Sequence, residues 1–484
     1  MMVDKTLDII VLGATGFTGK CTVKHLARLT KENYWDVTWA ISGRSKDKLQ
    51  GLITELNATG LGTKNMSVVE SDIENRESLK KAIQMAKIVI NCTGPNAILS
   101  PPIVEACIEC GTHYLDISAE MFHILSLYKN FNKAAEDASV LVIPSCGYAA
   151  IPAETALIFL ERQFKGTLNT VECYTELILP KRAYVPGRTL LHNGTWTSLV
   201  YVLETFKDHL ALWKELFPTP IEPEPEEMKK SFFHRHNGRT WFPYPGTENE
   251  LVDMSERYLY QKTQKKPVHF KAYTTVPMFF HFIIVPVMFV YYYLSYFKCF
   301  RKLLINFPRL MTLGYVSQRG PSQKTRQAMK YNFVLNGKGW DLGADLNSKP
   351  TKTMSVKVSG SDPGYDTTAV AIIMCAITIL KETSNMPKAG VLMPGAAFYR
   401  TDIVDRLMHE GYTYEVVNRM QKKMKNPKDF LQKGINILIK AVDEDKNHNY
   451  EEALRCYVQG VMILLHVANY NTESQLAKDS LKEK

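Results

Sequence analysis

The sequence predicts an α/β protein: a doubly wound parallel sheet at the N-terminus, a second mixed α/β domain, and a small C-terminal α-helical bundle. Two observations predict the sheet. Short apolar runs alternate with stretches of helical spacing through residues 1–146, and three glycines at three-residue intervals directly follow the first apolar run. A length of 484 residues with 45% hydrophobic residues allows two or three domains with real cores, which excludes a disordered chain.

The first element is the apolar run Leu7–Leu12, which predicts a short buried strand, and residues 17–29 have the spacing of a helix. The turn between them has the pattern G-x-x-G-x-x-G. Glycine permits a tight turn and the close approach of a ligand's pyrophosphate, while the helix N-terminus supplies unpaired N–H groups and partial positive charge. The alternative is an ordinary tight turn. The dinucleotide site predicted here consists of Gly13, Ala14, Thr15, Gly16, Phe17, Thr18 and Gly19.

The second strand, residues 37–43, is followed by basic and hydroxyl side chains where an NAD site places an acidic residue against the ribose. Arg44 offers a planar fork of donors that suits a phosphate, and Ser45 and Lys48 add to it. The expected cofactor is therefore NADP, with NADPH preferred over NADH. The alternative is that these residues only cap and solvate the next helix.

The alternation continues with strands at residues 66–71, 87–92 and 113–117 and helices at residues 76–86 and 102–110. Asp72 follows the third strand, where its carboxylate would meet the adenine end of a cofactor; the alternative is an N-cap for the helix that begins near Arg76. The fourth strand ends in the turn "NCTGP", at the sheet edge where ligands of such folds bind. Thr93, Gly94 and Pro95 are therefore expected on the nicotinamide side.

A second domain is predicted over residues 147–418. Strand-like runs at residues 171–179, 331–335 and 354–358 predict an antiparallel sheet. Residues 217–230 are rich in proline and glutamate, which predicts a solvated surface insertion between two of these strands.

Composition argues against several other classes of protein. The nine cysteines form no even framework and the N-terminus passes straight into a strand, which predicts a reducing compartment facing the cytosol. Cys107 and Cys110 form a lone C-x-x-C without a second pair or a histidine at zinc spacing, so no metal is expected. The net charge of +10 is spread along the chain, so nucleic acid is not an expected partner.

Six motifs spread over residues 7–417 resemble those of the saccharopine dehydrogenase-like oxidoreductases of animals: "LGATGFTG", "AISGRS", "NCTGP", "YLDISAE", "PSCGYAAIPAE" and "HNGTW". The resemblance implies a Rossmann domain followed by a mixed α/β domain inserted before the last helix. It also implies an NADP-linked redox role and association with lipid droplets or other membranes. More distant relatives include bacterial trans-acting enoyl reductases of lipid synthesis, which makes a lipid-derived substrate an expectation.

The chain departs from the family pattern at residues 147–152, where members commonly read G-F-D-S-I-P and this sequence reads G-Y-A-A-I-P. If the missing acid and hydroxyl orient substrate or cofactor, the chain is a catalytically inactive scaffold that binds cofactor or membrane. If they only cap a helix, the cost is about 1 kcal/mol of stability. No catalytic residue is assigned, and the candidate proton donors are Asp116, Glu120, Tyr148 and His192.

Residues 276–297 contain no Asp, Glu, Lys or Arg and are flanked by Lys271 and Lys298. Their length would permit a spanning helix, but Pro286 interrupts it and the later strands must rejoin the N-terminal domain. An interfacial or re-entrant anchor is therefore expected, in a lipid-droplet surface or on the cytosolic face of an intracellular membrane. The alternatives are a buried apolar helix or a contact between copies in a homo-oligomer.

Beyond a polar linker at residues 419–429, apolar residues at helical spacing predict two antiparallel helices. Residues 430–484 resemble the microtubule-interacting and trafficking (MIT) domain of ESCRT-associated AAA ATPases, a three-helix bundle that binds helical tails of ESCRT-III subunits. The third helix, residues 474–484, stops short. ESCRT-III tails are therefore expected partners and an ESCRT-linked adaptor is a further hypothesis. The resemblance is carried by Ala441, Asp445, Tyr450, Ala453, Leu454, Tyr457 and Gly460.

Overall fold

The computed structural model describes residues 5–32, 36–62, 66–148, 150–180, 183, 185, 187–275, 286–287, 289–417, 427–447, 449–450, 452–454 and 456–457. The chain forms two compact units, Met1–Val417 and Asn418–Lys484. Most of the predicted linker, residues 419–426, lies outside the described residues.

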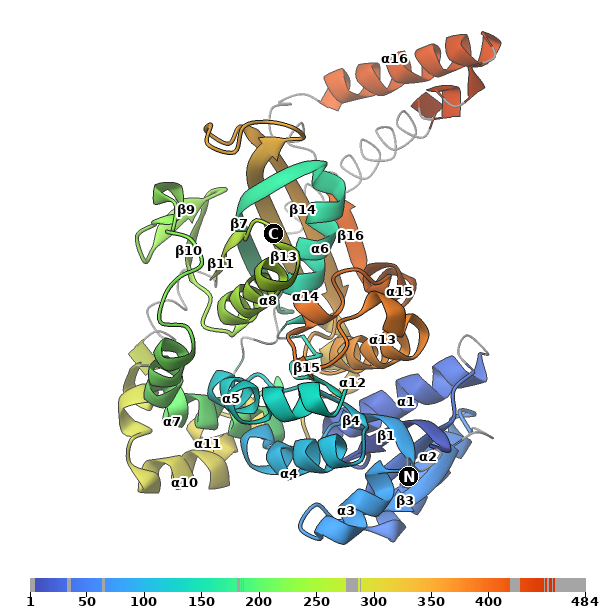
Figure 1. Cartoon of the computed structure of the whole chain (residues 1–484), viewed down its shortest axis with the longest axis vertical. Helices are drawn as coiled ribbons and strands as arrows, with labels where there is room; N and C mark the ends of the chain where they lie inside the picture. Colours follow the sequence, from blue (N-terminus) through green and yellow to red (C-terminus); the bar gives the residue numbers. More distant parts are fainter. Residues whose placement is uncertain are drawn as a thin grey trace, which may run out of the picture. The chain divides into compact units, whose positions relative to one another are not determined.

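The first sheet of the larger unit has seven parallel strands in the order β15-β6-β5-β4-β1-β2-β3 (Figure 1). The strand order reverses between β1 and β4, which is the place where ligands of doubly wound sheets bind. The predicted doubly wound parallel sheet is confirmed. Its strands are β1 (Leu7–Leu12), β2 (Trp39–Gly43), β3 (Met66–Glu70), β4 (Ala86–Asn91), β5 (His113–Asp116), β6 (Leu141–Ile143) and β15 (Gly390–Val391).

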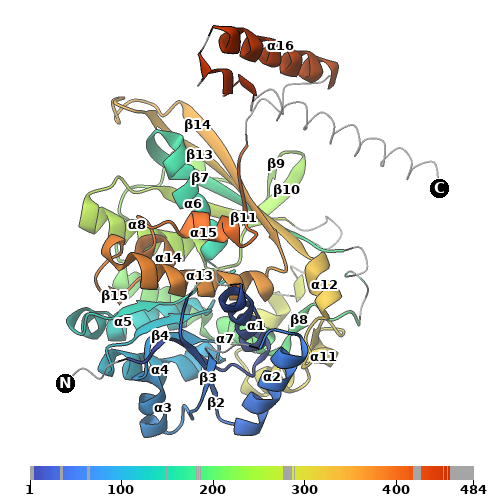
Figure 2. The same cartoon turned by 90° about the vertical axis from the view of Figure 1, so that its right-hand side faces the viewer.

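The two faces of this sheet pack into two different cores. In β1, Ile9 and Val11 belong to a core that includes side chains of α1, α2 and α13, whereas Ile10 and Leu12 belong to a core with α3, α4 and α5. Figure 2 shows α1 beside α13, and the two helices are in contact. The helices are α1 (Phe17–Lys31), α2 (Lys46–Ala58), α3 (Arg76–Ile83), α4 (Asn96–Glu109), α5 (Met121–Asp137) and α13 (Asp366–Glu382).

The prediction of a helix from residue 102 is wrong at its start, because α4 begins at Asn96 and contains Pro101 and Pro102. A proline removes only its own N–H donor to the fourth preceding carbonyl, and these two fall in the first two turns. The hydrogen bond from Ser100 Oγ to Asn96 Oδ1 (3.2 Å) supports that part of the helix.

The second sheet is mixed and has the order β16-β14-β13-β7-β11-β10-β9. The three predicted strands fall in β7, β13 and β14, which pair antiparallel, while β11 pairs with β7 in parallel. The prediction of an antiparallel sheet is therefore corrected at β11. The strands are β7 (Gly166–Ile178), β9 (His234–His236), β10 (Arg239–Pro243), β11 (His269–Thr274), β13 (Lys330–Asp341), β14 (Lys352–Ser361) and β16 (Thr413–Val416).

One face of the second sheet is covered by α6 (Ile151–Phe164) and α8 (Glu248–Thr263), with α14 (Pro394–Ala397) and α15 (Ile403–His409) beside them (Figure 1). After β14 the chain returns to the first sheet through α13, and β15 pairs with β6. The first sheet is therefore completed by residues far beyond residue 146.

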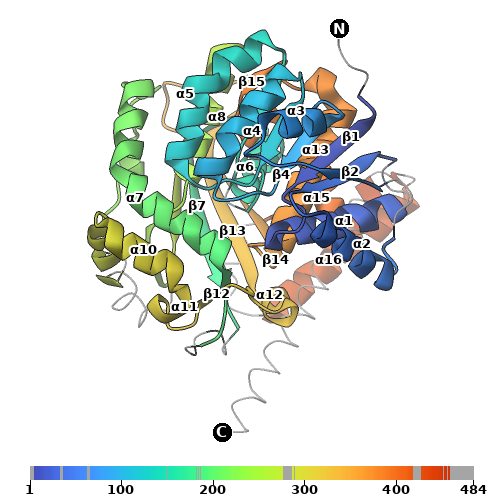
Figure 3. The ribbon, with the colours of Figure 1, turned by 90° about the horizontal axis from the view of Figure 1, so that it is seen from below.

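A third group of elements lies side by side at one edge of this unit (Figure 3). It contains α7 (Asn193–Leu216), α10 (Lys298–Asn306) and α11 (Pro308–Met311), and the short strands β8 (Leu191–His192) and β12 (Val316–Ser317) pair in parallel next to them. Helix α12 (Gln323–Ala328) follows. Residues 217–230 form bends and a short 3-10 helix, Glu226–Met228.

Among the described residues, one helical span, Asp366–Asn385, is long and apolar enough to cross a membrane, and 78% of its apolar window is buried inside the protein. This span includes α13, a helix of the core. The predicted membrane segment, residues 276–297, is only partly described, because residues 276–285 and 288 lie outside the described residues.

The smaller unit is described only over its first part. Helix α16 (Pro427–Lys446) precedes a second helical stretch, and Ala441, Ala453 and Cys456 are buried between them. The predicted third helix at residues 474–484 lies outside the described residues.

Candidate cofactor site

The glycine turn after β1 is held by contacts that leave no room for side chains. Gly13 has φ +72°, and a Cβ there would lie 2.9 Å from Thr93 Cγ2. A Cβ on Gly19 would lie 2.1 Å from the carbonyl oxygen of Gly13, and one on Gly16 would lie 3.2 Å from the same atom. The glycines thus allow a tight turn in which α1 packs closely against the end of β1.

The N-terminus of α1 is open to an anion. Gly16 is the N-cap, no side chain of the described residues caps the helix, and its first turn contains no acidic residue. The first-turn N–H groups therefore keep their capacity to bind negative charge. Phe17, Thr18 and Gly19 form that first turn, and Ala14 and Thr15 precede the N-cap.

Arg44, directly after β2, and Lys48, in the first turn of α2, are exposed. Arg44 forms no ion pair with another described residue. Ser45 Oγ accepts a hydrogen bond from Lys48 N–H (3.3 Å) and is the N-cap of α2. Ser45 therefore has the capping role that the sequence left open, while the guanidinium of Arg44 keeps its donors available.

Asp72 does not cap α3, so that alternative is wrong. The N-cap is Asn75, whose Oδ1 accepts from Ser78 N–H (3.0 Å). Asp72 Oδ1 instead accepts from Glu74 N–H (3.2 Å) within the preceding turn. Its carboxylate lies at the carboxyl edge of the sheet, next to the strand end where Ser42 and Ser71 share a 2.6 Å hydrogen bond.

The turn after β4 is fixed by the buried side chain of Asn91. Its Oδ1 accepts from Thr93 N–H (3.0 Å) and Thr93 Oγ1 (2.6 Å), and the Gly94–Pro95 peptide is cis. Because Thr93 also touches Gly13, the turns after β1 and β4 form one continuous surface at the strand-order reversal. The structure therefore brings together the two turns that the sequence predicted for the cofactor.

Asp116 is the centre of a buried polar network at the end of β5. Its Oδ1 accepts from Ser118 N–H (2.9 Å) and Ser145 N–H (3.0 Å), and its Oδ2 accepts from Tyr114 Oη (2.9 Å). Burial alone would raise the pKa of Asp116. The imidazole of His123, 3.9 Å away, and the hydrogen bond from Ser118 N–H hold this pKa below its ordinary value. This candidate proton donor is therefore a buried carboxylate that joins β5 to the loop after β6.

The other candidate donors occupy different surroundings. Glu120 is 2% exposed and its Oε2 accepts from Ala119 N–H (2.9 Å). The ring of Tyr148 packs against Tyr331 of β13 (5.1 Å between centroids), and burial raises the pKa of its hydroxyl well above the ordinary value. Both lie in loops at the carboxyl edge of the first sheet.

His192 reaches the glycine turn from the second part of the chain. Its ring stacks on that of Phe17, with 4.8 Å between centroids and 17° between planes, and its Nδ1 accepts from Gly194 N–H (3.0 Å) as the N-cap of α7. Burial lowers the pKa of His192, so the ring is neutral at physiological pH.

Two residues beside the site were missed in the sequence. Tyr365 packs edge-on against Phe17 (4.7 Å) and its Oη accepts from His192 N–H (2.7 Å). Arg326 Nη1 donates to Asp362 (2.8 Å) and Asp366 (3.0 Å), which ties α12 to the start of α13. The sequence feature that could have drawn attention to Tyr365 is "DPGYD", residues 362–366, a turn directly before a long apolar helix.

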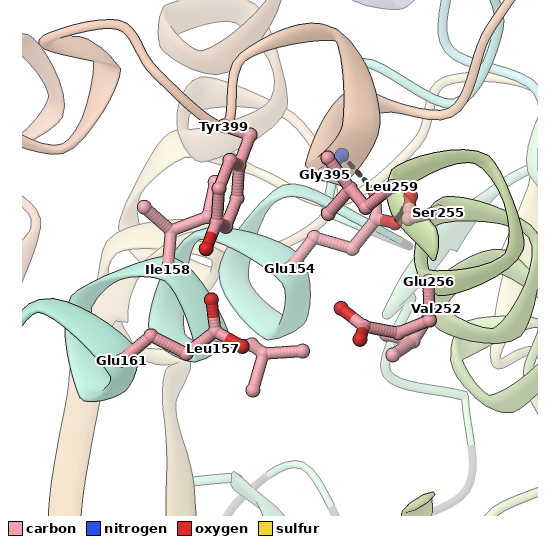
Figure 4. A pocket seen from close by; sticks show the side chains of 10 residues that line it. All are labelled: Glu154, Leu157, Ile158, Glu161, Val252, Ser255, Glu256, Leu259, Gly395 and Tyr399. Carbon is pink, nitrogen blue, oxygen red and sulfur yellow. Dashed lines mark hydrogen bonds between the residues drawn. The ribbon is translucent and has the colours of Figure 1, made fainter. Parts of the chain in front are cut away.

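A cavity of about 10 Å³, lined by apolar side chains and by Glu154, Glu161 and Glu256, lies elsewhere, between α6, α8 and α14 (Figure 4). Glu154 Oε1 accepts from Ser255 Oγ (2.5 Å) and its Oε2 from Gly395 N–H (2.9 Å), and burial raises the pKa of Glu154 to about 7. The volume suits one water molecule, so this cavity is not a substrate site. Across the described residues, no group of three His, Cys, Asp or Glu side chains is arranged to hold a metal.

Comparison with known families and proteins gives matches for both units. Residues 9–143 match the Saccharopine dehydrogenase NADP binding domain, and residues 431–484 match the MIT (microtubule interacting and transport) domain. The chain is 32% identical over 431 residues to the saccharopine dehydrogenase-like oxidoreductase of Mus musculus, covering 86% of this chain and 98% of the relative.

Two other curated relatives are more distant. The lipid droplet localized protein of Caenorhabditis elegans is 28% identical, over 84% of this chain and 98% of its own length. The trans-acting enoyl reductase of Mycobacterium bovis is 28% identical over 36% of this chain and 40% of its own length. Among solved structures, a saccharopine dehydrogenase (L-Glu forming) from Saccharomyces cerevisiae matches with a TM-score of 0.47 at 14% identity, covering 85% of this chain and 100% of that one.

Proposed function

Because the chain belongs to the saccharopine dehydrogenase-like oxidoreductases, we propose that it is an NADP-dependent oxidoreductase that prefers NADPH over NADH. The observation that carries the proposal is the glycine turn. A Cβ at Gly13 or Gly19 would collide with the backbone and one at Gly16 would be tight, and the turn presents the uncapped, acid-free N-terminus of α1 at the strand-order reversal.

The residues present suit an NADP-type cofactor. The first turn of α1 would hold the pyrophosphate, and the exposed Arg44 with Lys48 and the hydroxyl of Ser45 would hold the 2′-phosphate. Asp72 would contact the adenine end. Thr93, Gly94 and Pro95 would border the nicotinamide, in a turn that Asn91 keeps rigid.

When bound, the cofactor supplies or accepts a hydride, and the chain must orient the substrate, exclude water and handle one proton. Asp116 is unsuited to give that proton because its pKa lies below the ordinary value and its oxygens are already hydrogen-bonded. His192 is a neutral N-cap whose ring covers Phe17. Glu120 and Tyr148 are therefore the remaining candidates for the proton donor.

Calorimetric titration of NADPH and NADH into the full chain tests the cofactor. Arg44→Asp should weaken NADPH binding about ten- to a hundredfold, the loss expected for one or two charge-assisted hydrogen bonds, and leave NADH binding nearly unchanged. Lys133→Asp makes the same charge change at an exposed site on α5 and should leave both affinities unchanged. Binding of neither nucleotide by the unmodified protein would refute the proposal and favour the inactive scaffold that Tyr148, Ala149 and Ala150 suggest.

A second proposal concerns location and substrate. We propose that the protein associates with a membrane or lipid droplet and acts on a lipid-derived substrate. The names of the worm and mycobacterial relatives and the apolar residues 289–297 support this proposal. A fluorescent fusion should coincide with a neutral-lipid dye on droplets or with a membrane marker. A diffuse cytosolic signal would contradict the location.

The MIT match supports a third proposal, that residues 430–484 bind helical tails of ESCRT-III subunits. Pull-down of the full chain with immobilised ESCRT-III tails tests it, with a complete MIT domain from another protein as the positive control. Capture of the control but not of this chain would refute the proposal and leave the oxidoreductase function untouched.

A further inference from the structure

The edge elements of the larger unit carry a group of apolar side chains that the fold does not bury. They project from residues 289–297 and from α10, α11 and the turn after it. Tyr293 is 62% exposed, Phe307 is 56% exposed and Leu310 is 71% exposed. We call these residues the outer face; they are Phe289, Val290, Tyr293, Phe297, Leu303, Phe307, Leu310 and Leu313.

The outer face belongs to ordered helices whose other sides are already packed. The ring of Tyr291 contacts Trp196 of α7 (6.3 Å between centroids) and Phe300 of α10 (5.8 Å). Arg301 Nη1 donates to the carbonyl of Ser295 (2.6 Å). In α10, Leu304 is fully buried while its neighbour Leu303 is exposed. The outer face is therefore not needed for the internal packing of these elements and is available to bind a partner.

The charged residues of the segment that carries this face are all basic. No Asp or Glu occurs between Glu256 and Asp341 in the sequence. Lys298, Lys302 and Arg309 are exposed among the apolar residues, and none of them forms an ion pair with another described residue. Arg301, in contrast, forms an ion pair with Glu204 of α7 (2.7 Å), which links α10 to α7.

We infer that the outer face, with Lys298, Lys302 and Arg309, is the surface by which the protein seats on a lipid layer that contains anionic headgroups. This inference rests on the proposed membrane association and names its surface. Aromatic and leucine side chains beside lysine and arginine fit the boundary between headgroups and acyl chains. Each cation near an anionic layer adds to the attraction.

The same charges argue against a second copy of the chain as the occupant. A twofold contact would bring the cations of one outer face against those of its partner, with no acidic residue from this part of the chain to balance them. A lipid layer accepts the apolar side chains and neutralises the cations at once.

Flotation of the full chain with vesicles tests the inference. Vesicles of phosphatidylcholine alone are compared with vesicles that also contain phosphatidylserine. Phe307→Asp with Leu310→Asp should lower the bound fraction at least about tenfold, because two exposed apolar side chains would no longer enter the layer. Lys298→Glu with Lys302→Glu and Arg309→Glu should abolish the preference for phosphatidylserine.

The matched control is Leu342→Asp with Leu346→Asp, which places two acids on leucines that are 88% and 44% exposed in the turn after β13. This control should float like the unmodified protein. Equal flotation of the Phe307/Leu310 variant would overturn the inference. A second result would also overturn it. In this result, the unmodified protein does not float with vesicles and sediments as a dimer, and the Phe307/Leu310 variant sediments as a monomer.

NADPH binding by every variant separates this inference from the proposed enzyme function. None of the outer-face residues is assigned to the cofactor site, so the variants should keep the affinity of the unmodified protein. Vesicle binding without NADPH binding in the unmodified protein would refute the cofactor proposal alone. NADPH binding without vesicle binding would refute the outer face alone.

Discussion

The imidazole of His192 stacks on the phenyl ring of Phe17 with 4.8 Å between centroids and 17° between planes. Phe17 is the first residue of α1 in the glycine turn, and His192 ends β8 far along the chain. Tyr365 closes the edge of Phe17, and a Cβ on Gly320 would lie 2.6 Å from the same ring. The candidate cofactor turn is thus bordered by residues from the part of the chain between β6 and β15.

This stack predicts an energetic coupling between Phe17 and His192. His192→Asn keeps a side-chain acceptor for Gly194 N–H but removes the ring, and Phe17→Leu keeps an apolar side chain. A double-mutant cycle in urea should give a coupling of about 0.5–1.5 kcal/mol, the range of a stacked aromatic pair. Strictly additive effects of the two substitutions would show that the stack contributes nothing.

A second prediction compares two glycines on neighbouring helices. Gly19→Ala should destabilise the protein and abolish NADPH binding, because its Cβ would lie 2.1 Å from the carbonyl oxygen of Gly13. Gly51→Ala in α2 meets no atom within 4 Å and should stabilise the protein by about 0.5–1 kcal/mol. Thermal unfolding and calorimetry of both variants measure the contrast, and similar behaviour of the two would contradict the close packing.

Much of the first sheet could be predicted from the sequence because its determinants are local. Buried parallel strands are short apolar runs, and the glycine pattern marks the turn between strand and helix. The strands that became β7, β13 and β14 were found for the same reason. The pairing of β15 with β6 joins residues more than two hundred positions apart, and no local pattern encodes it.

The site was predictable where one segment builds it and not where several segments meet. The glycine turn and the "NCTGP" turn were located, and the structure places Gly13 against Thr93. The contact of His192 with Phe17 depends on the return of the chain to the first sheet. The N-cap of α3 was assigned to Asp72 as an alternative, whereas Asn75 is three residues closer to the helix and reaches Ser78. The assignment of the cofactor-binding residues stays a prediction.

Asp116→Asn is expected to destabilise the larger unit strongly. The amide would keep the size of the side chain but place an NH₂ group where Oδ1 or Oδ2 accepts hydrogen bonds from Ser118, Ser145 and Tyr114. Breaking a buried network that contains a charge costs about 3–5 kcal/mol. Urea unfolding at neutral pH measures the loss, with Asp137→Asn on the exposed side of α5 as the control.

The pH dependence of the stability of Asp116→Asn tests whether the charge of Asp116 stabilises the fold. The pKa of Asp116 is lower in the folded protein than in the unfolded chain, so the carboxylate stabilises the fold above the unfolded value and this stability is lost as the pH falls. The difference between the unmodified protein and Asp116→Asn should therefore shrink on acidification. A difference that stays constant down to acidic pH would show that the charge of Asp116 has no part in the network.

Glu248 predicts the opposite trend. It is the first residue of α8, is 1% exposed, and lies beside Tyr244. Burial raises the pKa of Glu248 to about 8, and neither of its carboxylate oxygens accepts a hydrogen bond from a described residue. The folded protein therefore keeps the proton that the unfolded chain loses above its ordinary pKa of 4.5. The contribution of Glu248 to stability is full at acidic pH and decreases as the pH rises from about 4.5 toward 8.

Glu248→Gln should remove this decrease, because glutamine has the shape of the protonated acid and carries no charge. The unmodified protein and the variant should be about equally stable below pH 4.5, and the variant should gain up to about 1.4 kcal/mol per pH unit between pH 4.5 and 8. Glu154, Glu250 and Glu256 also have raised pKa values, so the difference between variant and unmodified protein isolates Glu248. Glu226→Gln on the exposed 3-10 helix should leave the slope unchanged. Parallel stability curves for the unmodified protein and Glu248→Gln would mean that Glu248 is ionised in the folded state and that its burial is compensated by the surrounding hydroxyls.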